Sequence, residues 1–160
     1  MWYSINLPSP MGKIFAVSDG TSITGLWFED QQKPPPVPAG CVPRTGLPVF
    51  RATEQWLEQY FEGENPGPIP PLSPAGTAFQ QTVWGWLRDI PYGQMVTYGT
   101  LASHFSTPMS AQAVGGAVGR NPIAVLIPCH RVVGAHGAVT GYAGGLWRKE
   151  ALLRLEGSLA

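Results

Sequence analysis

The sequence predicts an α+β protein, with a small N-terminal antiparallel sheet and one helix followed by a mainly helical C-terminal half. Short runs of β-branched and aromatic residues, separated by turn signals, fill the first 28 residues and favour strands. Apolar residues at helical spacing dominate after residue 50 and favour helices. A chain of 160 residues with 44% hydrophobic residues can bury one core and a smaller second one.

Three strands are expected near the N-terminus, because tight turns separate the β-rich runs there. Their ranges are 2–7, 13–18 and 22–28. Short connections between successive strands favour antiparallel pairing. Residues 33–48 follow the third strand, and their six prolines predict a surface loop.

One helix is expected after this loop, and it should end at Gly63. Its apolar stripe consists of Phe50, Trp56, Leu57, Tyr60 and Phe61. Residues 65–74 contain five prolines, a composition typical of a linker. The sequence therefore predicts an N-terminal domain at 1–76, which includes this linker, and a C-terminal domain at 77–160.

The C-terminal domain is expected to begin with a helix at 77–90 and to continue with a helix-turn-helix. The apolar face of the first helix consists of Phe79, Val83, Trp86, Leu87 and Ile90. A short helix at 98–105, a turn at 106–108 and a helix capped by Ser110 have the spacing of a DNA-reading motif. The second helix of this motif is poor in bulk and charge, so tight packing inside the core is the alternative interpretation.

Residues 127–132 carry the clearest chemical signal. An apolar strand at 123–127 is expected to end before Cys129, which stands next to His130 and Arg131. Both neighbours can lower a cysteine pKa and expose the thiolate as a nucleophile. A flexible loop at 140–145 and a final helix complete the chain. That helix should bury Leu146, Ala151, Leu152 and Leu155, with Glu156 at its end and Gly157 as its C-cap.

Charge and cysteine usage narrow the function classes. The first 76 residues carry four basic and seven acidic side chains, and the rest carry six basic and three acidic ones, so the halves differ as −3 and +3. This asymmetry favours a polyanion as partner of the C-terminal half, with a plain solvated surface as the alternative. No export signal, membrane-spanning run or metal-ligand spacing is found, so we expect a cytoplasmic protein with free thiols at Cys41 and Cys129.

An ordered set of motifs resembles the O6-alkylguanine-DNA alkyltransferases. The set consists of Asn121-Pro122, Pro128-Cys129-His130-Arg131-Val132, Gly141-Tyr142-Ala143-Gly144-Gly145 and Lys149-Glu150. The resemblance covers residues 1–157 and is strongest from residue 77. It implies repair of alkylated double-stranded DNA by a monomer without a cofactor or metal, with single-stranded DNA as a further substrate. One alkyl group would pass from O6-alkylguanine, or from O4-alkylthymine, to Cys129.

The resemblance also implies roles for individual residues. Cys129 would take the alkyl group as a thioether, and His130 would relay the thiol proton through a water while Glu156 orients the imidazole. Tyr98 would donate its phenolic hydrogen toward the leaving purine. Asn121 would stabilise the turns around the cysteine, and Arg131 would be a structural ion-pairing residue.

Two further sets of residues follow from the same resemblance. The expected substrate-binding residues are Val132, Tyr142, Ala143, Gly144 and Lys149. The expected DNA-binding residues are Gln112, Ala113, Gly115 and Arg120. Members of the family usually carry an arginine where Gln112 stands, and that arginine enters the duplex where the damaged nucleotide leaves. Glutamine is shorter and uncharged, so this chain should extrude bases from a duplex less readily.

Two other functions remain open at this point. A cysteine hydrolase is one, although adjacent residues on a strand point to opposite faces, which would separate Cys129 from His130. A sensor that binds alkylated bases without reacting is the other. Relatives of that kind typically replace the cysteine, so Cys129 argues against it. His104 and His136 have no assigned role and are expected to be exposed.

Overall fold

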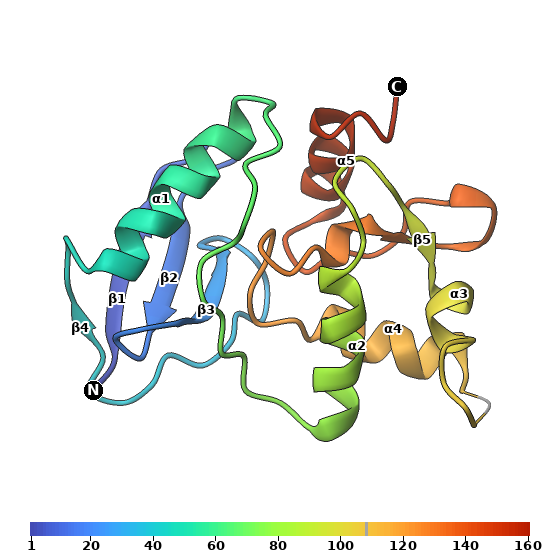
Figure 1. Cartoon of the computed structure of the whole chain (residues 1–160), viewed down its shortest axis with the longest axis horizontal. Helices are drawn as coiled ribbons and strands as arrows, with labels where there is room; N and C mark the ends of the chain where they lie inside the picture. Colours follow the sequence, from blue (N-terminus) through green and yellow to red (C-terminus); the bar gives the residue numbers. More distant parts are fainter. Residues whose placement is uncertain (108) are drawn as a thin grey trace. The chain divides into compact units, whose positions relative to one another are not determined.

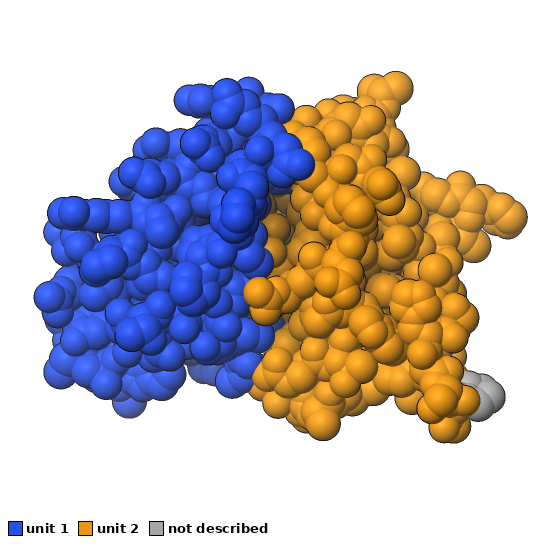
Figure 2. Space-filling view, viewed as in Figure 1, with its two compact units in different colours: residues 1–75, 122–124 blue, residues 76–121, 125–160 orange. Residues whose placement is uncertain are grey.

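The computed structural model describes residues 1–107 and 109–160. The chain forms two compact units (Figure 2), one of residues 1–75 with 122–124 and one of residues 76–121 with 125–160. The functional division into two domains at residue 76 remains a prediction. The predicted turn at 106–108 includes Pro108, which lies outside the described residues.

Unit 1 contains a four-stranded sheet in the order β3-β2-β1-β4 (Figure 1). Its strands are β1 (Tyr3–Leu7), β2 (Ile14–Ser18), β3 (Ile23–Phe28) and β4 (Val42–Pro43). The first three pair antiparallel, as predicted. The predicted loop at 33–48 is wrong in one respect, because β4 lies in it and pairs parallel with β1. Val42 N donates to Trp2 O and Arg44 N to Ser4 O, which satisfies the edge of β1.

Helix α1 (Pro48–Phe61) covers one face of this sheet in Figure 1. Proline at its first position suits a helix start, and Gly63 follows its end with a φ of 87°. The predicted stripe is confirmed for Phe50, Trp56, Leu57 and Tyr60, which are all buried.

Unit 2 begins with α2 (Ala78–Arg88) and continues with α3 (Tyr98–Ala102) and α4 (Ala111–Gly119). Ser110 caps α4 by accepting from Ala113 N at 3.0 Å, as predicted. The predicted stripe on α2 missed Trp84, which is 2% exposed and donates from Nε1 to Ala117 O at 2.9 Å. Helix α3 is shorter than predicted, because Phe105 leaves the helix and stacks on Phe79 at 5.2 Å.

The rest of unit 2 consists of short strands, 3-10 turns and a final helix. Strands β5 (Val96–Thr97) and β6 (Val132–Val133) form a parallel pair, which the sequence did not predict. Two 3-10 turns, η1 (Cys129–Arg131) and η2 (Ala135–Gly137), flank β6. Helix α5 (Leu146–Leu155) ends the fold. No helix among the described residues is long and apolar enough to cross a membrane.

The predicted strand at 123–127 is wrong. Ile123 makes a single bridge with Leu26, and a turn follows in which Val125 has a φ of 67°. A short apolar run does not distinguish a strand from a buried turn. Here Asn121 closes the turn by donating from Nδ2 to Ile127 O at 2.8 Å.

The predicted buried side of α5 is also partly wrong. Leu146 is 44% exposed, and Ala151 and Leu155 are only half-buried. The buried residues of the helix are Arg148, Lys149, Leu152 and Leu153. Two cations are buried because they bind backbone carbonyls of the preceding loop, which replaces their interactions with water.

Candidate active site

Cys129 is the first residue of η1, directly after the turn that Asn121 closes, and it is only 9% exposed. Burial raises the pKa of the Cys129 thiol above its ordinary value. A hydrogen bond from Asn121 and the charge of Lys149 lower this pKa but do not outweigh burial. The expectation that His130 and Arg131 lower the pKa of Cys129 is therefore wrong. The resting group is a thiol, which needs a base before it can act as a nucleophile.

The carboxylate of Glu156 joins the two residues that follow Cys129. His130 Nε2 lies 2.7 Å from Glu156 Oε2, and Arg131 Nε donates to Glu156 Oε1 at 2.8 Å. Arg131 Nη2 adds a bond to Oε2 at 3.0 Å, and Arg131 Nη1 donates to Ile90 O at 2.7 Å. All three side chains are buried. Arg131 is therefore an ion-pairing residue that fixes Glu156, as the sequence predicted.

The charge of Glu156 determines which nitrogen of His130 carries hydrogen. Burial raises the pKa of Glu156, but hydrogen bonds and charge from His130 and Arg131 outweigh it and lower this pKa to about 2. An ionised carboxylate only accepts, so Nε2 of a neutral His130 must donate to it. Burial lowers the pKa of His130 and keeps the ring neutral. Nδ1 is then the nitrogen with a lone pair, and the ring is set to act as a base through it.

Acid is expected to reduce the free energy of unfolding in two stages. The unfolded chain protonates His130 near its ordinary pKa of 6.5 while the buried ring resists, so stability falls as the pH drops below that value. Glu156 stays ionised down to about pH 2, whereas its ordinary value is 4.5, so its contribution of about 3 kcal/mol is lost between these values. Urea unfolding across this range measures both stages. Glu156→Gln should remove the stage between pH 4.5 and pH 2. An unchanged acid profile in that variant would contradict the assignment of this stage to Glu156.

The first turn of α5 holds the loop at 140–145. Lys149 Nζ donates to Thr140 O and, at 3.1 Å, to Gly141 O. Arg148 Nη1 donates to Gly144 O at 2.9 Å. Burial lowers the pKa of Lys149 to about 8, although Cys129 opposes this. Arg148 was not predicted. Its position in the first turn of a helix could have indicated the role, because the helix dipole disfavours a positive charge there. A cation at such a position is stabilised when it donates to backbone carbonyls, as Arg148 does to Gly144 O.

Tyr98, the first residue of α3, lies between this loop and α4. Its ring centroid is 5.8 Å from Lys149 Nζ, and a Cβ at Gly115 would lie 3.6 Å from the ring. The small residues of α4 thus allow close approach to Tyr98. Burial raises the pKa of Tyr98, Cys129 adds to this, and a hydrogen bond with Thr140 opposes it. The phenol is therefore protonated and can donate.

The structure brings together most of the predicted site residues. Those in or around the cysteine site are Cys129, His130, Glu156, Tyr98, Asn121, Tyr142 and Lys149. Val132 is fully buried in β6, Gly144 is buried and Ala143 is exposed. On α4, Gln112 and Ala113 are exposed in the first turn, and Arg120 is exposed at the other end. Their binding to DNA stays a prediction.

Much of the positive charge of the C-terminal half is internal. Arg131, Arg148 and Lys149 are buried. The remaining cations of that half, Arg88, Arg120 and Arg154, are exposed. The surface available to attract a polyanion is therefore less positive than the sequence count indicates.

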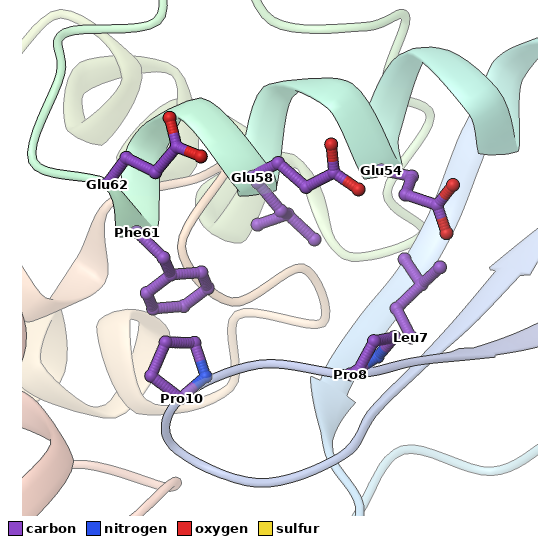
Figure 3. Close-up of a pocket in the computed structure, with 8 residues that line it drawn as sticks. Leu7, Pro8, Pro10, Glu54, Glu58, Phe61 and Glu62 are labelled. Carbon is purple, nitrogen blue, oxygen red and sulfur yellow. The ribbon is translucent and has the colours of Figure 1, made fainter.

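A groove of about 230 Å³ lies in unit 1, and none of the predicted site residues lines it. Figure 3 shows Glu54, Glu58 and Glu62 along α1 above the apolar side chains of Phe61 and Pro10. Three carboxylates along this rim would repel a polyanion such as DNA. This groove is therefore not a candidate DNA-binding surface.

The fold and the site define a protein whose buried cysteine is followed in the chain by a histidine that is bonded to a buried carboxylate, in a unit that also contains a helix-turn-helix. Residues 78–158 match the family described as "6-O-methylguanine DNA methyltransferase, DNA binding domain". The chain belongs to the family of methylated-DNA–protein-cysteine methyltransferases.

Three comparisons describe the relationship. The chain is 46% identical over 155 residues to the methylated-DNA–protein-cysteine methyltransferase of Haemophilus influenzae, which covers 96% of this chain and 86% of that protein. The crystal structure of Mycobacterium tuberculosis O6-methylguanine methyltransferase superposes with a TM-score of 0.88 at 41% identity, over 100% of this chain and 95% of that one. A second structure, Mycobacterium tuberculosis OGT in complex with DNA, gives 0.86 at 41% identity, over 98% and 92% of the two chains. The predicted α+β fold is confirmed by these matches.

Proposed function

We propose that this protein repairs DNA by moving one alkyl group from O6-alkylguanine to Cys129, with O4-alkylthymine as a second substrate. The observation that carries the proposal is the buried Cys129 thiol next to a neutral His130 whose Nε2 is fixed by Glu156 at 2.7 Å. Membership of the methyltransferase family supports the reaction, and the DNA complex of a related structure supports DNA as the partner.

The proposed reaction begins with the thiol proton of Cys129. His130 takes this proton at Nδ1 through a water, and Glu156 stabilises the imidazolium that forms. The thiolate attacks the alkyl carbon, so an S–C bond forms as the C–O6 bond breaks and its electron pair stays on the guanine. Tyr98 donates a hydrogen bond to the purine as charge develops on it. Asn121 positions the cysteine through the turn that it closes.

The proposed substrate site combines the loop and the helix-turn-helix. Backbone groups at Val132 and Ala143 form hydrogen bonds with the extruded base. Lys149 donates to a carbonyl of the loop at 140–145, and Gly144 accepts from Arg148, so both residues hold this loop in place. On α4, Gln112 and Ala113 face the duplex from the first turn, Gly115 allows close approach, and Arg120 supplies a cation at the helix end. Gln112 is the residue at which this chain departs from its family.

The alternative functions have less support. Cys129 lies in a 3-10 turn and not on a strand, so the alternation of side chains along a strand does not separate it from His130. A hydrolase needs a labile acyl intermediate, whereas an alkyl thioether has no route to hydrolysis. A non-reacting sensor does not need a cysteine with a base beside it. A cytoplasmic location stays a prediction, supported by a DNA substrate and by free thiols at Cys41 and Cys129.

A single methyl transfer per molecule is the expected result with an oligonucleotide that contains O6-methylguanine. Intact-mass analysis should show an increase of one methyl group, peptide mapping should place it on Cys129, and no second turnover should follow. Cys41→Ser should react as the wild type does. Cys129→Ala should transfer nothing yet keep its affinity for DNA. Repeated turnover, or a methyl group on Cys41, would overturn the proposed function.

A further inference from the structure

The groove in unit 1, between α1 and the loop that follows β1, is a surface that alkyl transfer does not use (Figure 3). The described residues that line it are only leucine, proline, phenylalanine and glutamate. Each of these side chains is either apolar or a carboxylate, which accepts hydrogen bonds when it is ionised. The prolines have no backbone N–H either. A ligand of this groove must therefore supply the donors itself, which disfavours anions and favours cations.

One side of the groove is a row of three glutamates. Glu54 and Glu58 lie on successive turns of α1, and Glu62 is its C-cap. All three are exposed, and none of their side chains forms an ion pair or a hydrogen bond with another described residue. Like charges four residues apart on a helix repel each other and destabilise it. A bound cation would remove this repulsion.

The rest of the groove is apolar. Leu7 and Leu57 are buried, Phe61 is half-buried, and Pro8 and Pro10 are exposed on the side opposite the glutamates. The volume of about 230 Å³ lies below the range of about 300 to 1,000 Å³ that is usual for small-molecule pockets. The groove therefore suits one or two large side chains of a peptide better than a whole small-molecule ligand.

The spacing of the glutamates matches an extended peptide. An α-helix rises about 1.5 Å per residue, so carboxylates four residues apart are separated by about 6 Å along the axis. Alternate side chains of an extended segment lie on the same face, about 7 Å apart. Basic residues at alternate positions would thus face successive glutamates. The residue between two basic residues would point the other way, toward Phe61 and Pro10.

We propose that this groove binds an extended peptide segment of a partner protein, in which lysines or arginines alternate with large apolar residues. Glu54, Glu58 and Glu62 bind the cations, and the apolar part of the groove around Phe61 covers the apolar side chains. The glutamates repel nucleic acids and anionic membranes, so neither is the ligand. None of the predicted site residues lines the groove, so this inference does not rest on the proposed function.

The first test compares three fluorescein-labelled peptides with the sequences Lys-Leu-Lys-Leu-Lys, Lys-Ser-Lys-Ser-Lys and Glu-Leu-Glu-Leu-Glu. Fluorescence anisotropy measures their affinities for the full-length wild type. We expect the lysine-leucine peptide to bind, and the lysine-serine peptide to bind about 10-fold more weakly because it buries no large apolar side chain. The glutamate peptide should not bind, and salt should weaken the lysine-leucine peptide. Equal affinities of the two lysine peptides, or no binding by the lysine-leucine peptide, would overturn the inference.

Glu58→Lys tests whether the peptide occupies the groove. We expect this variant to bind the lysine-leucine peptide about 3- to 10-fold more weakly than the wild type, as for the reversal of one exposed charge. It should melt no lower than the wild type, because the new ammonium group lies one turn from both Glu54 and Glu62. Glu29→Lys is the matched control. Glu29 is exposed in the same unit but does not line the groove, so this variant should bind almost as the wild type does.

Glu58→Gln gives a second readout, because it removes the charge without adding one and should weaken binding less than Glu58→Lys does. Equal affinities of Glu58→Lys and Glu29→Lys for the lysine-leucine peptide would show only general attraction and would overturn the inference. Self-association of the wild type that Glu58→Lys abolishes, measured by sedimentation, would assign the groove to a second copy of the chain and would overturn it too. Methyl transfer should be the same in all of these variants, so loss of the inference leaves the proposed function intact.

Discussion

His130→Gln is expected to react with a free benzylguanine base about 100- to 10,000-fold more slowly than the wild type, the usual range for lost acid-base assistance. The physical reason is the raised pKa of Cys129, which leaves a thiol that must lose its proton. The variant removes the nitrogen that accepts it. Stopped-flow or quenched-flow rates with the free base measure this step without any contribution from DNA binding.

The control for His130→Gln removes the other partner of Glu156. Arg131→Met keeps the His130–Glu156 bond of 2.7 Å but removes the guanidinium that holds the carboxylate from the other side. Breaking a buried ion pair in this way costs about 3–5 kcal/mol of stability. We expect Arg131→Met to have the lower melting temperature of the two variants and His130→Gln to have the lower rate. A folded His130→Gln protein with the wild-type rate would show that the relay is wrong.

Glu156→Gln alone cannot separate these roles. Its carboxylate serves both His130 and Arg131, so the variant disturbs the base and the structural pair together. Rate and melting temperature should fall in parallel. A fully active Glu156→Gln protein would still contradict the relay.

Gln112→Arg is expected to speed repair of a duplex about 5- to 100-fold and to leave the reaction with a free base unchanged. A charged hydrogen bond from the new arginine to DNA contributes roughly 1 to 3 kcal/mol, against an extrusion cost of a few kcal/mol. Gln112 is exposed in the first turn of α4 and its neighbours Ala111 and Ala113 are small, so a longer side chain has room. Rates with duplex, mismatched and single-stranded O6-methylguanine substrates give the comparison. The wild type should prefer the last two more strongly than the variant does.

A matched control separates position from charge. Gln94 is exposed in the turn before β5, and Gln94→Arg adds the same cation elsewhere in unit 2. We expect a much smaller, salt-sensitive increase in rate from it, since a remote cation acts only by general attraction. Equal rates for Gln112→Arg and the wild type on both duplex and free base would mean that residue 112 does not enter the DNA.

Several elements were predictable because short-range chemistry decides them. The three strands of unit 1 are separated by turn residues, and the stripe of Phe50, Trp56, Leu57 and Tyr60 has helical spacing. Ser110 caps α4 with its own hydroxyl. The cysteine motif was recognisable because its residues are adjacent along the chain. In each case the deciding interactions lie within a few residues of one another.

The sequence by itself determined the α+β order and the family, and it predicted Cys129 as the nucleophile. Only the tertiary structure decided which side chains of the site are buried, how they pair and which of them carry a proton. The pKa of Cys129 rises because burial outweighs the hydrogen bond from Asn121 and the charge of Lys149, which lower it. Lys149 is buried because it binds the carbonyls of Thr140 and Gly141, nine and eight residues earlier. Glu156 joins His130 and Arg131 across about 25 residues of chain. Desolvation and pairing of this kind depend on which distant segments meet, and local patterns do not carry that information.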